Sequence, residues 1–104
     1  MKIGNVEISG EALGAICRKW KIRRLEIFGS ATTGRLRPDS DVDLLVEFEA
    51  DENWSLMDLA RAQEEFSLLL GRRVDLVDRA NLQRSANWIR RDAILNSAEL
   101  VYDS

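Results

Sequence analysis

The chain of 104 residues contains no histidine and only one cysteine and one proline. The absence of histidine excludes Ser-His and Cys-His catalysis, histidine-ligated zinc and imidazole acid–base chemistry. The single cysteine, Cys17, excludes an internal disulfide, and its place in an apolar helical stripe predicts a packed thiol. Any catalysis by this chain therefore has to use carboxylates and cations, and we expect a bound metal to assist them.

The sequence also lacks any apolar run long enough to span a membrane, and no apolar signal segment opens it. We therefore expect a cytoplasmic protein without a membrane partner. A net charge of −3 argues against a basic nucleic-acid-binding surface, so no direct contact with nucleic acid is expected. The length predicts a single domain, residues 1–104, with one modest core.

The hydrophobic pattern predicts helices that alternate with strands. Two consecutive strands separated by a loop of about a dozen residues make the sheet mixed, which predicts an α+β fold. We expect a mixed α/β two-layer structure with about four strands and with helices packed mainly on one face. The expected strands are 22–28, 41–49, 73–77 and 99–102, the expected helix caps are Ser9, Ser55 and Asn81, and Gly71 is expected to end the second helix.

Apolar stripes on these helices predict the core. The first helix carries Leu13, Ile16, Cys17 and Trp20 at helical spacing. The second stripe is expected to comprise Leu56, Leu59, Phe66 and either Leu69 or Leu70, and the last one Leu82, Ala86, Ile89 and Ala93. Of the three tryptophans, Trp20 and Trp88 are expected in the core, whereas Trp54 lies among polar residues and is the candidate for a binding surface.

The strand 41–49 alternates an apolar face with an acidic face. Val42, Leu44 and Val46 point to one side, and Asp41 and Asp43 begin the other. We expect the apolar face to pack on helices and the acidic face to meet water, ions or a ligand.

Asp41 and Asp43 are the first candidates for a functional site. Alternate strand residues lie about 7 Å apart on one face, which suits carboxylates that lean toward two cations about 3.5–4 Å apart. Oxygen ligands favour Mg²⁺ or Mn²⁺ over zinc. Asp75, on the polar face of another short strand, is the candidate for a third carboxylate. Considered separately, these residues are better explained as solvated strand aspartates, or one of the pair Asp41 and Asp43 as the cap of a turn.

Gly29 and Ser30 are the candidates for a phosphate site. A strand that ends in Gly-Ser before a turn presents backbone N–H groups and a hydroxyl to an anion. Alone, such a pair is usually only a turn. The fixed spacing to the aspartates is what makes it informative.

Gly29-Ser30, ten intervening residues and Asp41-Val42-Asp43 together resemble the signature of the polymerase-beta-like nucleotidyltransferase superfamily. The chain is most similar to the minimal nucleotidyltransferases, the MNT antitoxin partners of HEPN toxins. The resemblance covers nearly the whole chain, including residues 37–46 and 74–77. It implies the polymerase-beta-like nucleotidyltransferase fold.

The resemblance also implies a role for each matching residue. Gly29 and Ser30 would hold the β- and γ-phosphates of a nucleoside triphosphate. Asp41 and Asp43 would ligate two Mg²⁺ ions, with Mn²⁺ as the substitute, and Asp75 would complete the shell of the second ion and accept a proton. The implied reaction transfers AMP from ATP to a hydroxyl group, with release of pyrophosphate.

The chain departs from the family pattern directly after Gly-Ser. The family often has basic residues there, whereas this chain has Ala31, Thr32 and Thr33, and Arg35 is the first arginine that could hold the triphosphate. The chain is also short, so either a HEPN-type protein acceptor completes the cleft or the chain forms a homodimer. The alternative to an enzyme is a binding module that neutralises its partner by contact and keeps a vestigial or regulatory nucleotide site.

Overall fold

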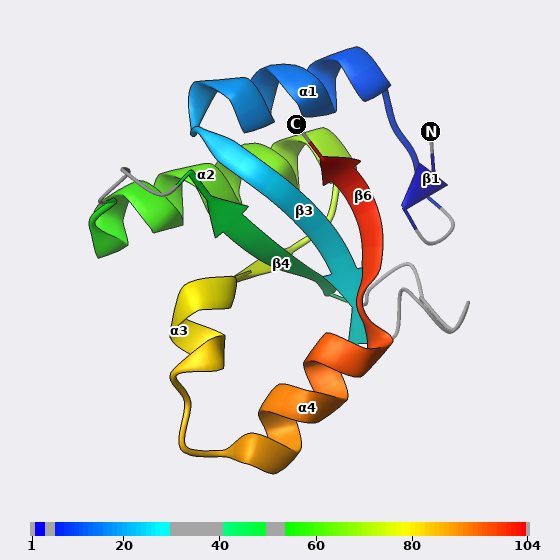
Figure 1. Cartoon of the computed structure of the whole chain (residues 1–104). Coiled ribbons are helices and arrows are strands. Elements are labelled where there is room, and N and C mark those ends of the chain that lie inside the picture. The colour runs from blue at the N-terminus through cyan, green and yellow to red at the C-terminus, as the bar shows by residue number, and fades with distance from the viewer. Residues whose placement is uncertain (1, 4–5, 30–40, 50–53, 104) are drawn as a thin grey trace.

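The computed structural model describes residues 2–3, 6–29, 41–49 and 54–103. Its centre is a four-stranded mixed sheet in the order β5-β4-β3-β6 (Figure 1). The strands are β3 (Ile22–Phe28), β4 (Val42–Phe48), β5 (Val74–Asp78) and β6 (Glu99–Asp103). β3 pairs antiparallel with β4 and β6, and β4 pairs parallel with β5, which confirms the mixed sheet.

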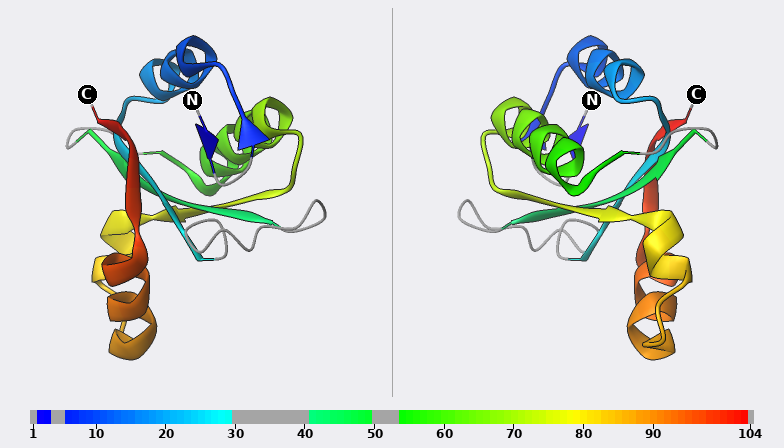
Figure 2. Two further views of the ribbon diagram at one scale, coloured as in Figure 1. Left: turned by 90° about the vertical axis from the view of Figure 1, so that its right-hand side faces the viewer. Right: turned by 90° about the vertical axis from the view of Figure 1, so that its left-hand side faces the viewer.

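Two helices cover one face of this sheet, α1 (Gly10–Lys19) and α2 (Leu56–Leu70) (Figure 2). Their apolar stripes meet the apolar side of β3 and β4 in the main core, which confirms the predicted facing of the strand 41–49. Cys17 is buried there, and burial raises the pKa of its thiol to about 12, as expected for a packed cysteine. A two-stranded hairpin, β1 (Lys2–Ile3) with β2 (Val6–Glu7), precedes α1.

The predicted caps of these two helices are confirmed. The Ser9 hydroxyl accepts a hydrogen bond from the Ala12 N–H, and Ser55 forms a reciprocal capping box with Asp58. Gly71 ends α2 in the left-handed region, at φ +66°. Leu56 is a correction: it begins α2 but is 83% exposed, because this first-turn residue lies outside the buried stripe that Ala62, Phe66 and Leu70 complete.

The other face of the sheet carries two further helices, α3 (Arg79–Gln83) and α4 (Trp88–Ser97) (Figure 2). They contact the sheet through a second apolar cluster of Phe28, Leu45, Leu82 and Ile94. Leu45 therefore corrects the expectation that this face of β4 is left to water, ions or ligand, since it is 1% exposed.

The C-terminal part also corrects the prediction of one helix capped by Asn81. Asp78 caps α3 by accepting from the Ala80 N–H, and Asn87 caps α4 by accepting from the Arg90 N–H. Two competing caps divide the segment, and Asn81 lies inside α3. Trp88 and Ile89 begin α4 and are 61% and 65% exposed, so their predicted core positions are wrong, whereas Trp20 is buried as expected.

No helix in the described ranges has the length and apolar character needed to cross a membrane.

Candidate functional site

The strand pairing brings the predicted carboxylates to one end of the sheet. In the parallel pair of β4 with β5, Asp43 lies directly beside Asp75, and Val42 beside Val74. Asp41 precedes Asp43 by two residues, just before β4 begins. Adjacent strands lie about 4.8 Å apart, so the pairing places carboxylates from two separate strands next to each other.

The surroundings of the Asp43 carboxyl raise its pKa. Burial is the largest cause that raises its pKa above the usual value. The negative charge of Asp75, and then that of Asp41, raises the pKa further, whereas the positive charge of Arg90 lowers it. Ionised Asp43 is therefore destabilised by its surroundings, which favours the binding of a positive charge beside it.

The donor set fits a hard divalent cation. Carboxylate oxygens are the ligands that Mg²⁺ and Mn²⁺ prefer, and the Asp41 and Asp75 side chains are exposed and accessible to an incoming ion. In the described part of the chain, no three acidic or cysteine side chains converge closely enough to form a ready metal site. An ion would therefore have to draw the carboxylates together.

Gly29 packs against the same carboxylate. It follows the last residue of β3, Phe28, which pairs with Asp43 across the sheet. Its φ is +75°, and a Cβ atom added there would lie 2.7 Å from Asp43 Oδ2. Only glycine satisfies both the backbone conformation and the space at this point. The first half of the predicted phosphate pair thus lies beside the aspartates, while Ser30 and Arg35 lie outside the described residues.

Arg90 is a neighbour of the site that the sequence analysis did not identify. It lies in the first turn of α4, and its positive charge acts on Asp43. Ile94, four residues later, packs with Phe28 and Leu45, which flank Asp43 on β3 and β4. A helix start at Asn87 and an inward-facing Ile94 would have indicated this position, because residues four apart share a helix face.

A cavity of about 320 Å³ lies at the other end of the sheet. Its lining includes Arg23 near the start of β3, Glu47 near the end of β4 and Arg79 of α3, so it excludes the candidate aspartates. Trp54 also lines it and packs edge-on against Trp20 at a centroid distance of 5.4 Å. The chemistry of the cluster around Asp43, rather than the size of this cavity, identifies the candidate site.

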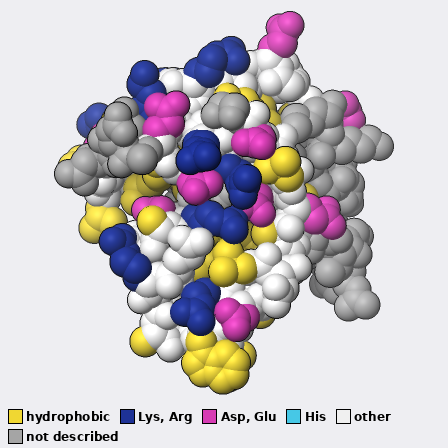
Figure 3. All heavy atoms as spheres, viewed as in Figure 1, with side chains coloured by type: hydrophobic (Ala, Val, Ile, Leu, Met, Phe, Trp, Pro, Cys, Tyr) yellow, Lys and Arg dark blue, Asp and Glu magenta, His cyan; other side chains and the backbone are white. Residues whose placement is uncertain are grey.

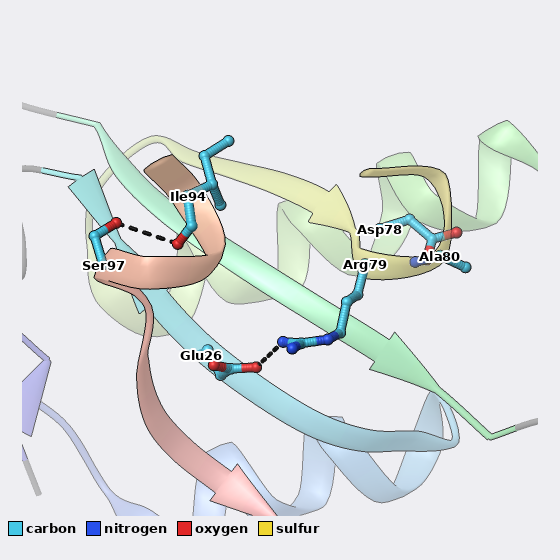
Figure 4. Close-up of polar contacts among 6 residues, drawn as sticks. All are labelled: Glu26, Asp78, Arg79, Ala80, Ile94 and Ser97. Atoms are coloured by element: carbon cyan, nitrogen blue, oxygen red, sulfur yellow. Dashed lines mark hydrogen bonds and ion pairs between the residues drawn. The ribbon is translucent and has the colours of Figure 1, made fainter. Parts of the chain in front are cut away.

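One ion pair lies close to this cavity. Arg79 reaches from α3 to pair with Glu26 on β3 (Figure 4). Arg24 and Glu47 are cross-strand neighbours, and basic and acidic side chains lie interleaved over the middle of the sheet (Figure 3). Side chains of opposite charge that face each other on adjacent strands attract one another.

Comparison with known proteins places these features in a family context. Residues 10–101 match the profile of the family described as a nucleotidyltransferase domain. A relative from Thermococcus cleftensis, named protein adenylyltransferase MntA, is 42% identical over 77 residues, which cover 73% of this chain and 76% of the relative.

Two solved structures have the same arrangement of helices and strands. One, described as a candidate minimal nucleotidyltransferase, is 36% identical with a TM-score of 0.67, over 88% of this chain and 87% of that one. The other is a tri-AMPylated Shewanella oneidensis HEPN toxin in complex with its MNT antitoxin; the matching chain has a TM-score of 0.61 at 19% identity, over 90% of this chain and 69% of that one. At that identity, the second similarity concerns the fold alone.

Proposed function

The chain belongs to the nucleotidyltransferase domain family, and we propose that it transfers AMP from ATP to a hydroxyl group of a partner protein. The observation that carries the proposal is the placement of Asp43 beside both Asp75 and Gly29. This juxtaposition joins a carboxylate pair to a strand end that lets backbone approach a phosphate closely.

Each residue at the site has a proposed role. Asp41 and Asp43 would hold two Mg²⁺ ions, for which Mn²⁺ could substitute, and Asp75 would complete the shell of the second ion. Bound ions of this kind neutralise phosphate charge and lower the pKa of an attacking hydroxyl. Asp75 takes the proton of the acceptor hydroxyl, and the backbone at Gly29, together with Ser30 and Arg35, holds the β- and γ-phosphates until pyrophosphate leaves.

The proposed acceptor is a HEPN-type protein, which makes this chain the antitoxin half of a toxin–antitoxin pair. The T. cleftensis relative is named a protein adenylyltransferase, and the S. oneidensis complex contains an AMPylated HEPN toxin. Trp88 and Ile89 supply exposed apolar surface at the start of α4, next to Arg90. Exposed tryptophan is typical of protein-binding surfaces, so these residues are suited to contact a protein that completes the cleft.

The test is a transfer reaction with α-labelled ATP, Mg²⁺ and the protein encoded beside this chain. We expect the label on that partner, and we expect Asp41→Asn and Asp43→Asn each to reduce labelling at least about 100-fold. Chelation of the metal should abolish transfer reversibly. Undiminished labelling by both variants would contradict the assigned roles.

The competing function is neutralisation by contact alone. The same variants decide it, because a binding module with a vestigial or regulatory nucleotide site needs neither carboxylate. If the variant carrying both substitutions, Asp41→Asn and Asp43→Asn, still suppressed the partner's activity fully, the transfer reaction would not be the mode of neutralisation.

A further inference from the structure

We propose that Arg90 binds a phosphate group of the nucleotide, an inference that rests on the proposed function. Arg90 lies in the first turn of α4, and α4 lies on the face of the sheet opposite α1 and α2 (Figure 2).

The position of Arg90 is fixed at both ends of its helix turn. Asn87 caps α4 by accepting a hydrogen bond of 3.2 Å from the Arg90 N–H. One turn later, Ile94 is buried in the cluster with Phe28 and Leu45. Because i and i+4 side chains share a face of a helix, the anchoring of Ile94 directs Arg90 toward the same side.

This anchor lies close to both halves of the candidate site. Phe28 pairs with Asp43 across the sheet and immediately precedes Gly29. Leu45 follows Asp43 by two residues, so their side chains lie on the same face of β4. The long cationic side chain of Arg90 therefore starts one helical turn from an apolar cluster that adjoins Asp43 on both β3 and β4.

The contacts of Arg90 differ from those of its neighbour on the same helix. Arg91 pairs with Asp92 at 3.3 Å. The Arg90 guanidinium forms no ion pair or hydrogen bond with another residue in the described ranges, although its charge acts on Asp43. The positive charge of Arg90 thus acts on Asp43 without forming an ion pair with it.

The separation between the Arg90 guanidinium and the Asp43 carboxylate suits an anion that lies between them. A phosphate can meet cations held by the aspartates on one side and the guanidinium on the other. Guanidinium binds phosphate through two parallel N–H donors, which an amide side chain cannot reproduce and an ammonium group reproduces only in charge. Arg90 would in this way supply positive charge from α4 to a nucleotide whose other contacts come from β3, β4 and β5.

The experiment compares Arg90→Gln with the matched control Arg91→Gln, which removes one positive charge from the next position of the same helix. Each protein is titrated with a non-hydrolysable ATP analogue in Mg²⁺ and, separately, with adenosine. We expect Arg90→Gln to weaken binding of the analogue at least about tenfold. Arg91→Gln should stay within about twofold of wild type, and adenosine should bind all proteins alike. Arg90→Lys should recover part of the loss.

The outcomes separate this inference from the proposed function. Equal affinities of Arg90→Gln and Arg91→Gln for the analogue would overturn the role of Arg90, as would an equal loss for adenosine. A wild-type protein that binds no nucleotide would overturn it as well. A wild-type protein that binds the analogue but labels no partner would contradict the transfer reaction and leave the Arg90 comparison valid. Thermal unfolding of both variants should match wild type, since Arg90 is exposed.

Discussion

The two faces of the central sheet are built from the same strands and serve different purposes. On the α1 and α2 side, Val42, Leu44 and Val46 of β4 are fully buried. On the other side, the intervening residues include Asp43 and Glu47, and only Leu45 is enclosed there. Alternation along a single strand therefore separates a closed apolar layer from an open polar one.

The difference shows how a small chain accommodates an unfavourable cluster of charge. Asp41, Asp43 and Asp75 lie near the start of β4 and the paired end of β5, and the negative charges of Asp75 and Asp41 raise the pKa of Asp43. The closed face supplies the stability that keeps the strands in register. Its packing should therefore affect folding, whereas changes on the open face should affect ligands first.

The largest expected effect is on the closed face, at Phe66 of α2. Its side chain is fully buried in the main core, so Phe66→Ala would lose apolar contacts and leave a cavity. We expect a loss of about 3–5 kcal/mol in the free energy of unfolding, measured by urea denaturation. Leu68→Ala on the same helix is the control, because Leu68 is 77% exposed and should change stability by no more than about 0.5 kcal/mol. Equal losses in the two variants would contradict the closed-face assignment.

A smaller effect is expected at Gly29, which follows the last residue of β3 and packs against the Asp43 carboxylate. Alanine there would combine a positive φ with a Cβ atom 2.7 Å from Asp43 Oδ2. We expect Gly29→Ala to destabilise the fold by about 1–3 kcal/mol and to impair nucleotide binding, measured by denaturation and by titration with an ATP analogue. Gly10→Ala is the matched control, because nothing lies within 4 Å of its added Cβ. A neutral Gly29→Ala would show that the close approach to Asp43 is not a constraint.

Much of the closed face could be predicted from local sequence. The alternation in 41–49, the caps at Ser9 and Ser55 and the glycine at the end of α2 are all short-range signals, and the structure confirms them. The division near Asn81 could not be decided in this way. Asp78, Asn81 and Asn87 are all chemically able to cap, and only tertiary contacts of Leu82 and Ile94 select two of them.

The candidate site shows the same division between local and long-range information. Spacing indicated Asp41 and Asp43, but the position of Asp43 beside Asp75 depends on the parallel register of β4 and β5, which the connection through α2 joins. Arg90 was missed because its relation to Asp43 requires the position of α4 on the open face. The exposure of Trp88 was missed for a similar reason, since a pattern of apolar residues does not show which turn of a helix extends beyond the core.

The smallest expected effect is electrostatic and concerns Asp43 without bound metal. Because the folded protein raises the pKa of this carboxyl, ionised Asp43 opposes folding at pH 7, and the penalty disappears when the pH falls below the usual carboxyl range. Asp43→Asn should therefore be more stable than wild type at pH 7, by less than about 1 kcal/mol because the site is partly solvated.

The stability difference between Asp43→Asn and wild type should depend on pH. The difference between Asp43→Asn and wild type should shrink as the pH is lowered toward about 3.9 and below, where wild-type Asp43 gains a proton. Adding Mg²⁺ at pH 7 should stabilise wild type and leave Asp43→Asn nearly unchanged, which would reverse the order of the two. Chemical denaturation at both pH values, with and without Mg²⁺, measures this. A variant less stable than metal-free wild type at pH 7 would indicate that Asp43 contributes to the fold itself, and the open face would then be less separate from the closed one.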